Sequence, residues 1–578
     1  MNQPLQLPST APAWPDLVNE INRHALAKLG KATSGFSLIE ASLVYIDWLA
    51  HLSISPGKQL DIAKNTLEDA QRAMVQVLNP GLTDEALQHD HRFESPAWQR
   101  WPFNLYAQGF QVMERAWDRA TLDVPGLSPR HTNIASFSAR QWMDIFSPAN
   151  NPWLNPDVIQ ATQNEGGMNL LRGAYNWLDD VHRIVHKLPA AGVDTFKVGE
   201  NVAVTPGKVV FRNDLIELIQ YSPSTDKVYA EPILIVPAWI MKYYILDLSP
   251  HNSMVKYLVD QGHTVFMISW KNPTSEDRDK NMETYRVDGV MAAMDVVARI
   301  VPDRNIHGVG YCLGGTMLGI AAATMGREKD DRLASMTLFA AQVDFTEAGE
   351  LLLFINESEV TLIEAMMAEQ GVLEGNQMAG TFQLLHSNDL IWSRLLKNYM
   401  LGQRDKPNDL MSWNADTTRM PYKMHSEYLR KLFLRNDLFR GRYKVDGQPI
   451  WFTDIHAPCF AVGTLTDHVA PWHSVYKLHL LPLDVTFVLT KGGHNAGIVS
   501  EPGHPHRSFQ LMRREACGTY LSPDEWEQKA PHQEGSWWPA WHNWLVQLSN
   551  GLVPPPAMGL PGNKKRLPDA PGSYVREP

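Results

Sequence analysis

Cysteine is scarce in this sequence, with 3 widely spaced residues among 578. Such a set provides no disulfide framework and no cysteine-based metal site, and we expect no metal or other cofactor. A low cysteine content is instead typical of the reducing cytoplasm, where a reactive thiol survives.

Long hydrophobic runs and a secretory signal are also absent. The longest apolar runs, such as 233–236, are far shorter than the roughly 20 residues of a transmembrane helix. Residues 1–15 are polar and rich in proline, without the basic start and apolar core of a signal peptide. We therefore expect a cytoplasmic protein with no membrane span.

Positive charge is in deficit, because 52 Lys and Arg residues face 63 Asp and Glu residues and the net charge is −11. This argues against nucleic acid as the main partner, since neutralising its phosphates requires clustered cations. It does not exclude a phosphorylated ligand held by a few local Lys or Arg side chains. With 44% hydrophobic and 20% charged residues, the composition is that of an ordinary globular protein.

The length predicts two domains. We expect a mobile start over residues 1–35, a helical domain over 36–200 and an extended tail over 553–578, which is rich in Pro and Gly. In the helical part, apolar side chains recur at helical spacing, as at Leu67 and Met74. No residue pattern in this part indicates catalytic chemistry.

Residues 201–552 follow a different pattern, in which short apolar runs alternate with helical stretches. This alternation predicts a mostly parallel, doubly wound sheet. A long stretch rich in Leu, Met and Trp interrupts it at 345–456. An insertion between two core strands is typical of a cap or lid over a catalytic edge, and a separate buried subdomain is compatible with the same pattern.

The chain is organised around the turn that follows the short strand 306–311. Glycines flank a single thiol at Cys312 and a helix begins beyond it; the turn is Gly310-Tyr311-Cys312-Leu313-Gly314-Gly315. This is the strand-turn-helix context of a nucleophile elbow, G-x-S-x-G, with cysteine in place of serine. A Cβ at the glycine positions would collide with the neighbouring strand and helix. The helix N-terminus favours a thiolate and an oxyanion, and a buried structural cysteine is the alternative.

Two later strands each end in a loop that carries a catalytic type of side chain. Asp467 follows the apolar run 459–463, and His494 follows the run 485–489. The order Cys312, Asp467, His494 is the nucleophile-acid-histidine order of the α/β-hydrolase fold. Because side chains beyond the C-terminal ends of parallel strands converge on one edge, the sequence predicts this fold with these residues as a triad.

Two further assignments depend on the predicted fold. Asp344, after the strand 334–340, is a rival acid, because some α/β-hydrolases place their carboxylate at that earlier strand end. The expected oxyanion donors are the backbone N–H groups of Leu313, directly after the nucleophile, and of Trp239, in the loop after the strand 232–236.

The turn at Cys312 resembles the lipase-like box of polyhydroxyalkanoate synthases, which carries cysteine where lipases carry serine. The resemblance extends from about Phe93 to Tyr574, and other segments that look like parts of this family are 237–250, 262–273, 413–419 and 467–472. The form Gly-Tyr-Cys-Leu-Gly-Gly-Thr looks nearer to the short-chain synthases. The sequence departs from the family pattern in its last few residues and at Asn495, where a bulkier aliphatic residue is expected. The departure at Asn495 bears on substrate preference more than on the reaction.

The resemblance implies a polymerase that joins (R)-3-hydroxyacyl-CoA thioesters into a polyester and releases CoA, which enters as a substrate group and not as a cofactor. Cys312 would carry the acyl group, His494 would take its proton, and Asp467 with His494 would activate the 3-hydroxyl group that attacks the next thioester. Transfer of the acyl group from one thioester to another costs little free energy. A serine would form a more stable oxygen ester and so lose the free energy that drives chain growth. The implied partners are the growing polyester, the surface of the polymer granule and a second copy of the chain in a homodimer.

Two rival functions differ from this one in chemistry. A cysteine-dependent thioesterase or a polyester depolymerase of the same fold would share the triad and use water as the acyl acceptor. A non-catalytic protein that coats granules would keep the fold without needing all three side chains, so the intact set argues against it.

Overall fold

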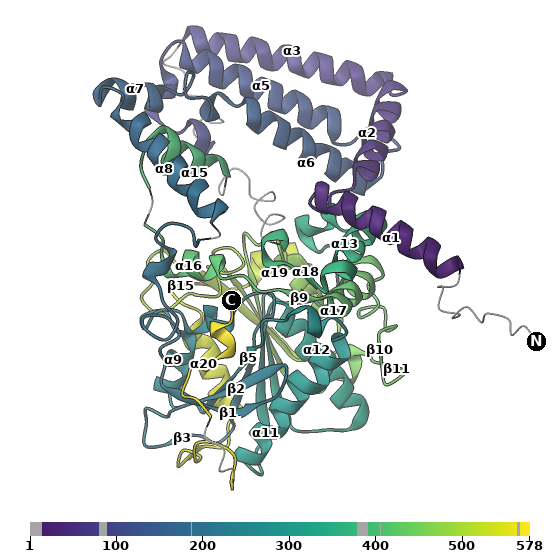
Figure 1. Cartoon of the computed structure of the whole chain (residues 1–578), viewed down its shortest axis with the longest axis vertical. Coiled ribbons are helices and arrows are strands. Elements are labelled where there is room, and N and C mark those ends of the chain that lie inside the picture. Colours follow the sequence, from purple (N-terminus) through teal and green to yellow (C-terminus); the bar gives the residue numbers. More distant parts are fainter. Residues whose placement is uncertain (1–13, 80–89, 187, 379–390, 405, 563–566) are drawn as a thin grey trace, which may run out of the picture. The chain divides into compact units, whose positions relative to one another are not determined.

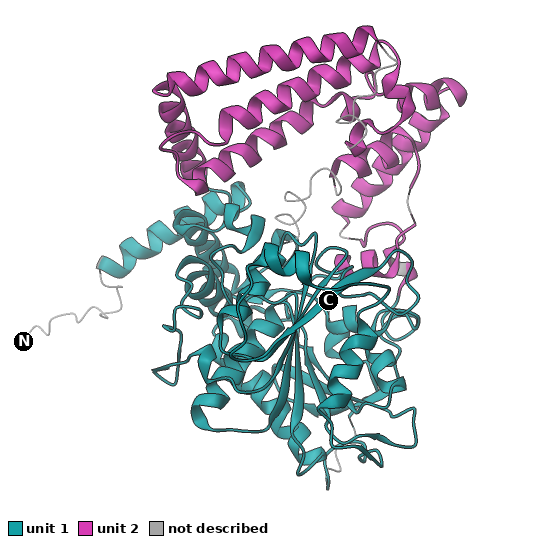
Figure 2. Cartoon of the chain, turned by 180° about the vertical axis from the view of Figure 1, so that it is seen from behind, with its two compact units in different colours: residues 1–37, 197–378, 416–578 teal, residues 38–196, 379–415 magenta. Residues whose placement is uncertain are grey.

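The computed structural model divides the chain into two compact units (Figure 2). The sheet unit comprises residues 1–37, 197–378 and 416–578, and the helical unit comprises residues 38–196 and 379–415. The structure describes all residues except 1–13, 80–89, 187, 379–390, 405 and 563–566.

Helices form the regular structure of the helical unit (Figure 1). Three of the α-helices, α3, α6 and α7, begin with proline. In α6 and α7 the N-cap side chains, Ser128 and Asn155, also accept hydrogen bonds from main-chain N–H groups of the first turn. The helices are α2 Leu38–Ser53, α3 Pro56–Leu78, α5 Phe103–Thr121, α6 Pro129–Phe146, α7 Pro156–Asn164, α8 Met168–Val185, α15 Ser393–Leu395, η10 Leu396–Met400 and α16 Asp409–Ala415.

Large apolar side chains on this unit face solvent. On α2, Ile39 and Ile46 are each 65% exposed. Within the described residues, no single helix has both the length and the hydropathy needed to cross a membrane. In the part of the chain that the structure describes, one pair of helices, α2 and α3, meets those requirements when taken together, and the two are bent by 89° where they join.

A ten-stranded sheet forms the centre of the sheet unit, in the order β1-β2-β5-β4-β6-β7-β12-β13-β14-β15 (Figure 1). Strands β5, β4, β6, β7, β12 and β13 run parallel, and antiparallel strands flank them on both sides. The predicted mostly parallel sheet is therefore confirmed. The strands are β1 Gly207–Arg212, β2 Ile216–Tyr221, β4 Ile233–Val236, β5 Val265–Trp270, β6 Ile306–Tyr311, β7 Leu333–Phe339, β12 Cys459–Thr464, β13 Val485–Thr490, β14 Ser508–Arg514 and β15 His532–Glu534.

The parallel strands are apolar because helices and loops cover them: every residue of β4, β5, β6, β12 and β13 is buried. Helix α12, Leu313–Glu328, packs against β6 and β7 and is buried from Leu313 to Met325. The other helices of the unit include α1 Trp14–Ala32, α9 Met254–Asp260, α10 Met282–Thr284, α11 Ala292–Ile300, α13 Glu357–Gln370, α17 Tyr422–Glu427, α18 Trp472–Tyr476, α19 Pro523–Lys529 and α20 Trp538–Gln547.

The start of the chain differs from the expectation of a mobile segment over 1–35. Residues 14–32 form α1, which packs against α13, and residues 1–13 lie outside the described part. His24 Nδ1 and Lys31 Nζ bind the two carboxylate oxygens of Glu369 at 2.7 and 2.6 Å. A helix with one apolar face is stable when a distant segment covers that face, and here α13 does so.

The expected cap over 345–456 is not a single insertion. Residues 379–415 belong to the helical unit, while the flanking parts remain in the sheet unit with α13, α17 and the π-helix η11, Tyr428–Leu434. In the sheet unit, these parts join the main hydrophobic core through Phe433 and other apolar side chains. Sequence spacing cannot reveal such a division, because both parts have the same apolar composition.

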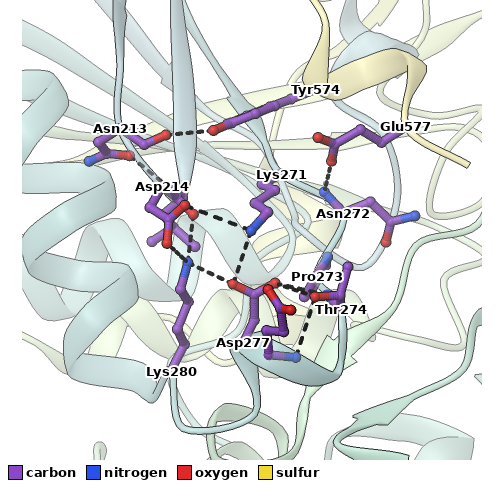
Figure 3. Close-up of polar contacts among 12 residues, drawn as sticks. Asn213, Asp214, Lys271, Asn272, Pro273, Thr274, Asp277, Lys280, Tyr574 and Glu577 are labelled. Atoms are coloured by element: carbon purple, nitrogen blue, oxygen red, sulfur yellow. Dashed lines mark hydrogen bonds and ion pairs between the residues drawn. The ribbon is translucent and has the colours of Figure 1, made fainter.

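The C-terminal residues 567–578, expected to belong to an extended tail, have little regular structure but lie against the sheet unit (Figure 3). Tyr574 Oη donates a hydrogen bond of 2.6 Å to the main-chain oxygen of Asn213. The carboxylate of Glu577 accepts a hydrogen bond of 2.9 Å from the main-chain N–H of Asn272, in the loop directly after β5. The segment therefore reaches the C-terminal edge of the parallel strands.

Charged contacts also hold the loop after β5 (Figure 3). Asp277 pairs with Lys271 at 3.1 Å and with Lys280 at 2.9 Å, and it accepts a hydrogen bond of 2.8 Å from the N–H of Thr274. Burial alone would raise the pKa of Asp277, but these partners lower it below its usual value. The loop is thus fixed by its own side chains as well as by Glu577.

Candidate active site

Cys312 lies in the turn between β6 and α12, with φ 51° and ψ −124°. An L-residue rarely adopts a positive φ, so the surrounding structure must enforce this conformation. One such constraint is the Cys312 N–H, which donates a hydrogen bond of 2.9 Å to the carbonyl of Phe339, at the end of β7. The Cys312 side chain is partly exposed, while Leu313 and the turns of α12 after it are buried. The arrangement presents one thiol at the start of a helix.

Close packing explains the glycines around the thiol. A Cβ on Gly310 would lie 2.8 Å from the main-chain nitrogen of Gly315, and a Cβ on Gly315 would lie 2.5 Å from Cβ of Ala341. A Cβ on Gly314 would lie 2.5 Å from the carbonyl oxygen of Pro237. The expected collisions with the neighbouring strand and helix are therefore present, and the start of α12 lies against the loop after β4.

Asp467 is a buried carboxylate whose side chain is 0% exposed. It accepts hydrogen bonds from Thr464 Oγ1 at 3.0 Å and from the main-chain N–H groups of Val469 and Ala470 at 2.9 and 2.8 Å. Burial alone would raise the pKa of Asp467, but the charge of His494 and these hydrogen bonds lower it. The group is ionised at neutral pH.

His494 connects the acid to the thiol. Its Nδ1 lies 2.8 Å from Asp467 Oδ2, so the carboxylate selects the tautomer with the proton on Nδ1 and leaves Nε2 for Cys312. Burial alone would lower the pKa of His494, but the charges of Asp467 and Cys312, and hydrogen bonds to both, raise it well above its usual value. The structure therefore brings the three predicted residues together in the order thiol, imidazole, carboxylate.

The sheet explains why these groups meet. Cys312 follows β6, Asp467 follows β12 and His494 follows β13, and these strands run parallel in one sheet. Strands β12 and β13 are neighbours in register, with Thr464 opposite Thr490, so their loops leave the sheet side by side. Convergence at the C-terminal strand ends, expected from the sequence, is observed.

The two expected oxyanion donors belong to the two segments that meet at Gly314: Leu313 directly precedes Gly314, and Trp239 lies two residues after Pro237. Within the described residues, neither the N–H of Leu313 nor that of Trp239 donates to another protein group. The ring of Trp239 is buried against Trp270 and Tyr285, and its carbonyl accepts a hydrogen bond of 2.7 Å from Thr418 Oγ1. The ring and the carbonyl of Trp239 thus anchor this loop, and among the described residues the N–H of Trp239 has no acceptor.

The rival acid, Asp344, is engaged elsewhere. It accepts hydrogen bonds from the N–H of Thr346 at 2.9 Å and from Asn436 Nδ2 at 2.7 Å, and Lys477 Nζ lies 3.3 Å away. Burial alone would raise the pKa of Asp344, but these three partners lower it. Its described contacts do not include His494, which favours Asp467 as the acid.

Sequence reasoning missed two groups at this site. Thr464, the last residue of β12, donates to Asp467, and the Thr-x-x-Asp spacing at a strand end could have suggested it. Tyr311, next to the nucleophile, hydrogen-bonds Asn495, next to the histidine. No local pattern reveals that second contact, since it joins residues 184 positions apart in the chain.

Comparison with known proteins agrees with the geometry. Residues 89–258 match the family model "Poly-beta-hydroxybutyrate polymerase (PhaC) N-terminus", residues 18–58 match "Poly-beta-hydroxybutyrate polymerase N terminal", and residues 231–501 match "alpha/beta hydrolase fold".

Similar curated proteins come from several bacteria. The poly(3-hydroxyalkanoate) polymerase subunit PhaC of Rhizobium meliloti is 38% identical over 492 residues, 84% of this chain and 80% of that protein. The poly(3-hydroxyalkanoate) polymerase of Methylorubrum extorquens is 38% identical over 516 residues, 89% of this chain and 84% of that protein. The PhaC subunit of Cupriavidus necator is 35% identical over 540 residues, 92% of this chain and 90% of that protein. These matches and the sheet confirm the expected family and fold: the chain is an acyltransferase with an α/β-hydrolase fold and belongs to the poly(3-hydroxyalkanoate) polymerase family.

Proposed function

We propose that polymerisation proceeds through an acyl-enzyme on Cys312. His494 accepts the thiol proton, and the thiolate attacks the carbonyl carbon of an (R)-3-hydroxyacyl-CoA thioester. The tetrahedral intermediate collapses with loss of CoA, which leaves with the proton that His494 returns. The N–H groups of Leu313 and Trp239 hold the oxyanion, and each such donor contributes on the order of 2.7–4 kcal/mol to transition-state stabilisation.

Elongation requires a second nucleophile, the 3-hydroxyl group of the bound acyl unit. An aliphatic hydroxyl is a weak nucleophile, so it needs a positioned base. Asp467 acts with His494 in that role, and the hydroxyl oxygen then attacks the next thioester carbonyl. One ester bond forms, one thioester bond breaks, and one CoA leaves for each unit added.

The observation that carries this proposal is the linkage of Cys312, His494 and Asp467, with the thiol held at positive φ at the start of a helix. A closely similar site could pass the acyl group to water, as a thioesterase or depolymerase does. The fate of the acyl group therefore decides between the two functions.

Incubation of the full chain with 3-hydroxybutyryl-CoA tests this choice, with CoA release and insoluble polymer measured together. We expect both to appear in parallel, and CoA release without polymer would support the hydrolase. The same assay with the C8 substrate gives the chain-length preference, for which the sequence favours C4.

We also propose that the protein acts as a homodimer at the surface of polymer granules in the cytoplasm. The exposed apolar side chains of α2, among them Ile39 and Ile46, support a surface that meets an apolar partner. Sedimentation of the purified chain and of its Ile39→Glu/Ile46→Glu variant, with and without polymer particles, separates self-association from granule binding.

A further inference from the structure

Two residues that flank the proposed nucleophile and base are joined side chain to side chain. Tyr311 directly precedes Cys312, Asn495 directly follows His494, and Tyr311 Oη lies 2.5 Å from Asn495 Oδ1. The Tyr311 ring also lies beside the imidazole of His494, with centroids 5.7 Å apart and planes inclined by 33°. Tyr311 thus lies against both His494 and Asn495.

The direction of this hydrogen bond is defined by chemistry. An amide oxygen only accepts, so the phenol is the donor and the Asn495 amide has one orientation. Tyr311 is 2% exposed, and burial, with the negative charges of Cys312 and Asp467, raises the pKa of its hydroxyl well above the usual value. The phenol therefore stays protonated and keeps its donor role over the working pH range.

The loop beyond His494 is a compact turn that needs such an anchor at its start. The Asn495 carbonyl accepts hydrogen bonds from the N–H groups of Ile498 and Val499 at 3.1 and 3.0 Å, and Trp537 Nε1 donates to the carbonyl of Gly497 at 3.0 Å. These bonds shape the far part of the turn. The Tyr311–Asn495 bond ties its near part to the elbow.

We propose that Tyr311 and Asn495 form a positioning pair that holds the imidazole of His494 in line with the Cys312 thiol. This inference rests on the proposed acyl-cysteine mechanism. An aliphatic side chain at position 495 has no acceptor, so it would leave the phenol without this partner. In this chain the amide at 495 and the phenol at 311 work together, and each loses its effect without the other.

The test uses Tyr311→Phe, which removes only the hydroxyl, Asn495→Leu, which is nearly isosteric without the acceptor, and the double variant. We measure the first burst of CoA from 3-hydroxybutyryl-CoA as a function of pH and substrate concentration. Each single variant should lower the maximal acylation rate about tenfold with KM within about twofold. The rise of the rate with pH should move to higher pH, because thiolate formation loses an aligned partner.

The double variant is decisive, because residues that act through one bond are not additive. We expect the double variant to acylate no more slowly than the slower single variant. If its acylation rate instead falls by the product of the two single-variant factors, the pairing is overturned. Unchanged acylation in both single variants, or a change in KM alone, would also overturn it. If one single variant does not fold, the other still tests the pair through its rate and pH profile.

Tyr476→Phe is the matched control, since Tyr476 is also a buried tyrosine and donates a hydrogen bond of 2.9 Å to the carbonyl of Leu521. It should lower the melting temperature without moving the pH profile. Failure of the underlying mechanism has a different signature: in that case, wild-type protein would show no acyl group on Cys312.

Discussion

Asp467 Oδ2 and His494 Nδ1 lie 2.8 Å apart, and both groups are held at the ends of adjacent parallel strands. The carboxylate also accepts hydrogen bonds from two main-chain N–H groups, so its position does not depend on the imidazole. An acid anchored in this way can serve two purposes: it orients the histidine, and it supplies negative charge where a hydroxyl proton must be removed.

Replacing Asp467 by Asn distinguishes these purposes. If the carboxylate activates the 3-hydroxyl group, the variant should still take up one acyl group, because thiolate formation at a helix N-terminus needs less help than an aliphatic hydroxyl. We expect a burst of about one CoA per active site followed by slow turnover, seen by rapid quench. Equal loss of burst and turnover would mean that Asp467 only orients His494.

Replacing Cys312 by Ala should abolish acyl transfer, because the thiol is the group that carries the acyl unit in the proposed mechanism. Cys459 and Cys517 should be dispensable: burial raises the pKa of Cys459 to about 12, and Cys517 is exposed in the segment that follows β14. Mass spectrometry of quenched protein checks this directly. A labelled acyl group on Cys459 or Cys517, with Cys312 unmodified, would contradict the assignment.

Replacing Asp344 by Asn should affect stability and leave acylation intact. Its folded pKa lies below the reference value of about 3.9, so the carboxylate stabilises the fold above that pH and loses this contribution as pH falls through the folded value. We expect a lower melting temperature than wild type at pH 7 and a smaller difference near pH 3. Loss of acylation in this variant would instead assign the role of the catalytic acid to Asp344.

Replacing Gly314 by Ala should destroy activity, because the new Cβ would meet main-chain carbonyls that cannot move without displacing the loop before Trp239. Gly109, in the interior of α5, has no neighbour within 4 Å of an added Cβ. Gly109→Ala is therefore the control, and it should stabilise the helix by up to about 1 kcal/mol. Turnover and melting temperature of both variants measure the contrast.

Much of the catalytic edge follows from local sequence. The elbow at Cys312 could be predicted because glycine spacing has a steric cause, and the order Cys312, Asp467, His494 follows from alternating strands and helices. Loops at the C-terminal ends of parallel strands must converge, so proximity of the three side chains required no knowledge of distant contacts.

Other contacts could not be predicted, since they join segments without any common pattern. The partner of α1 is α13, and a helical pattern shows an apolar face without showing what covers it. The contact of Glu577 with Asn272 and that of Asn495 with Tyr311 depend on how distant loops leave the sheet. A departure from the family pattern marked Asn495 in the sequence, but only the fold supplied its partner.

The helical unit has a consequence for protein engineering, because two separate stretches of chain build it. Arg404 binds Asp179 and Asp180 of α8, each at 2.6 Å, and Asn169 Nδ2 donates a hydrogen bond of 2.9 Å to the carbonyl of Met400. A truncated protein that begins at residue 197 would therefore lack α8, the helix that the later stretch contacts through Arg404 and Met400. Chimeras between relatives keep this interface only when residues 38–196 and 379–415 are exchanged as a matched set.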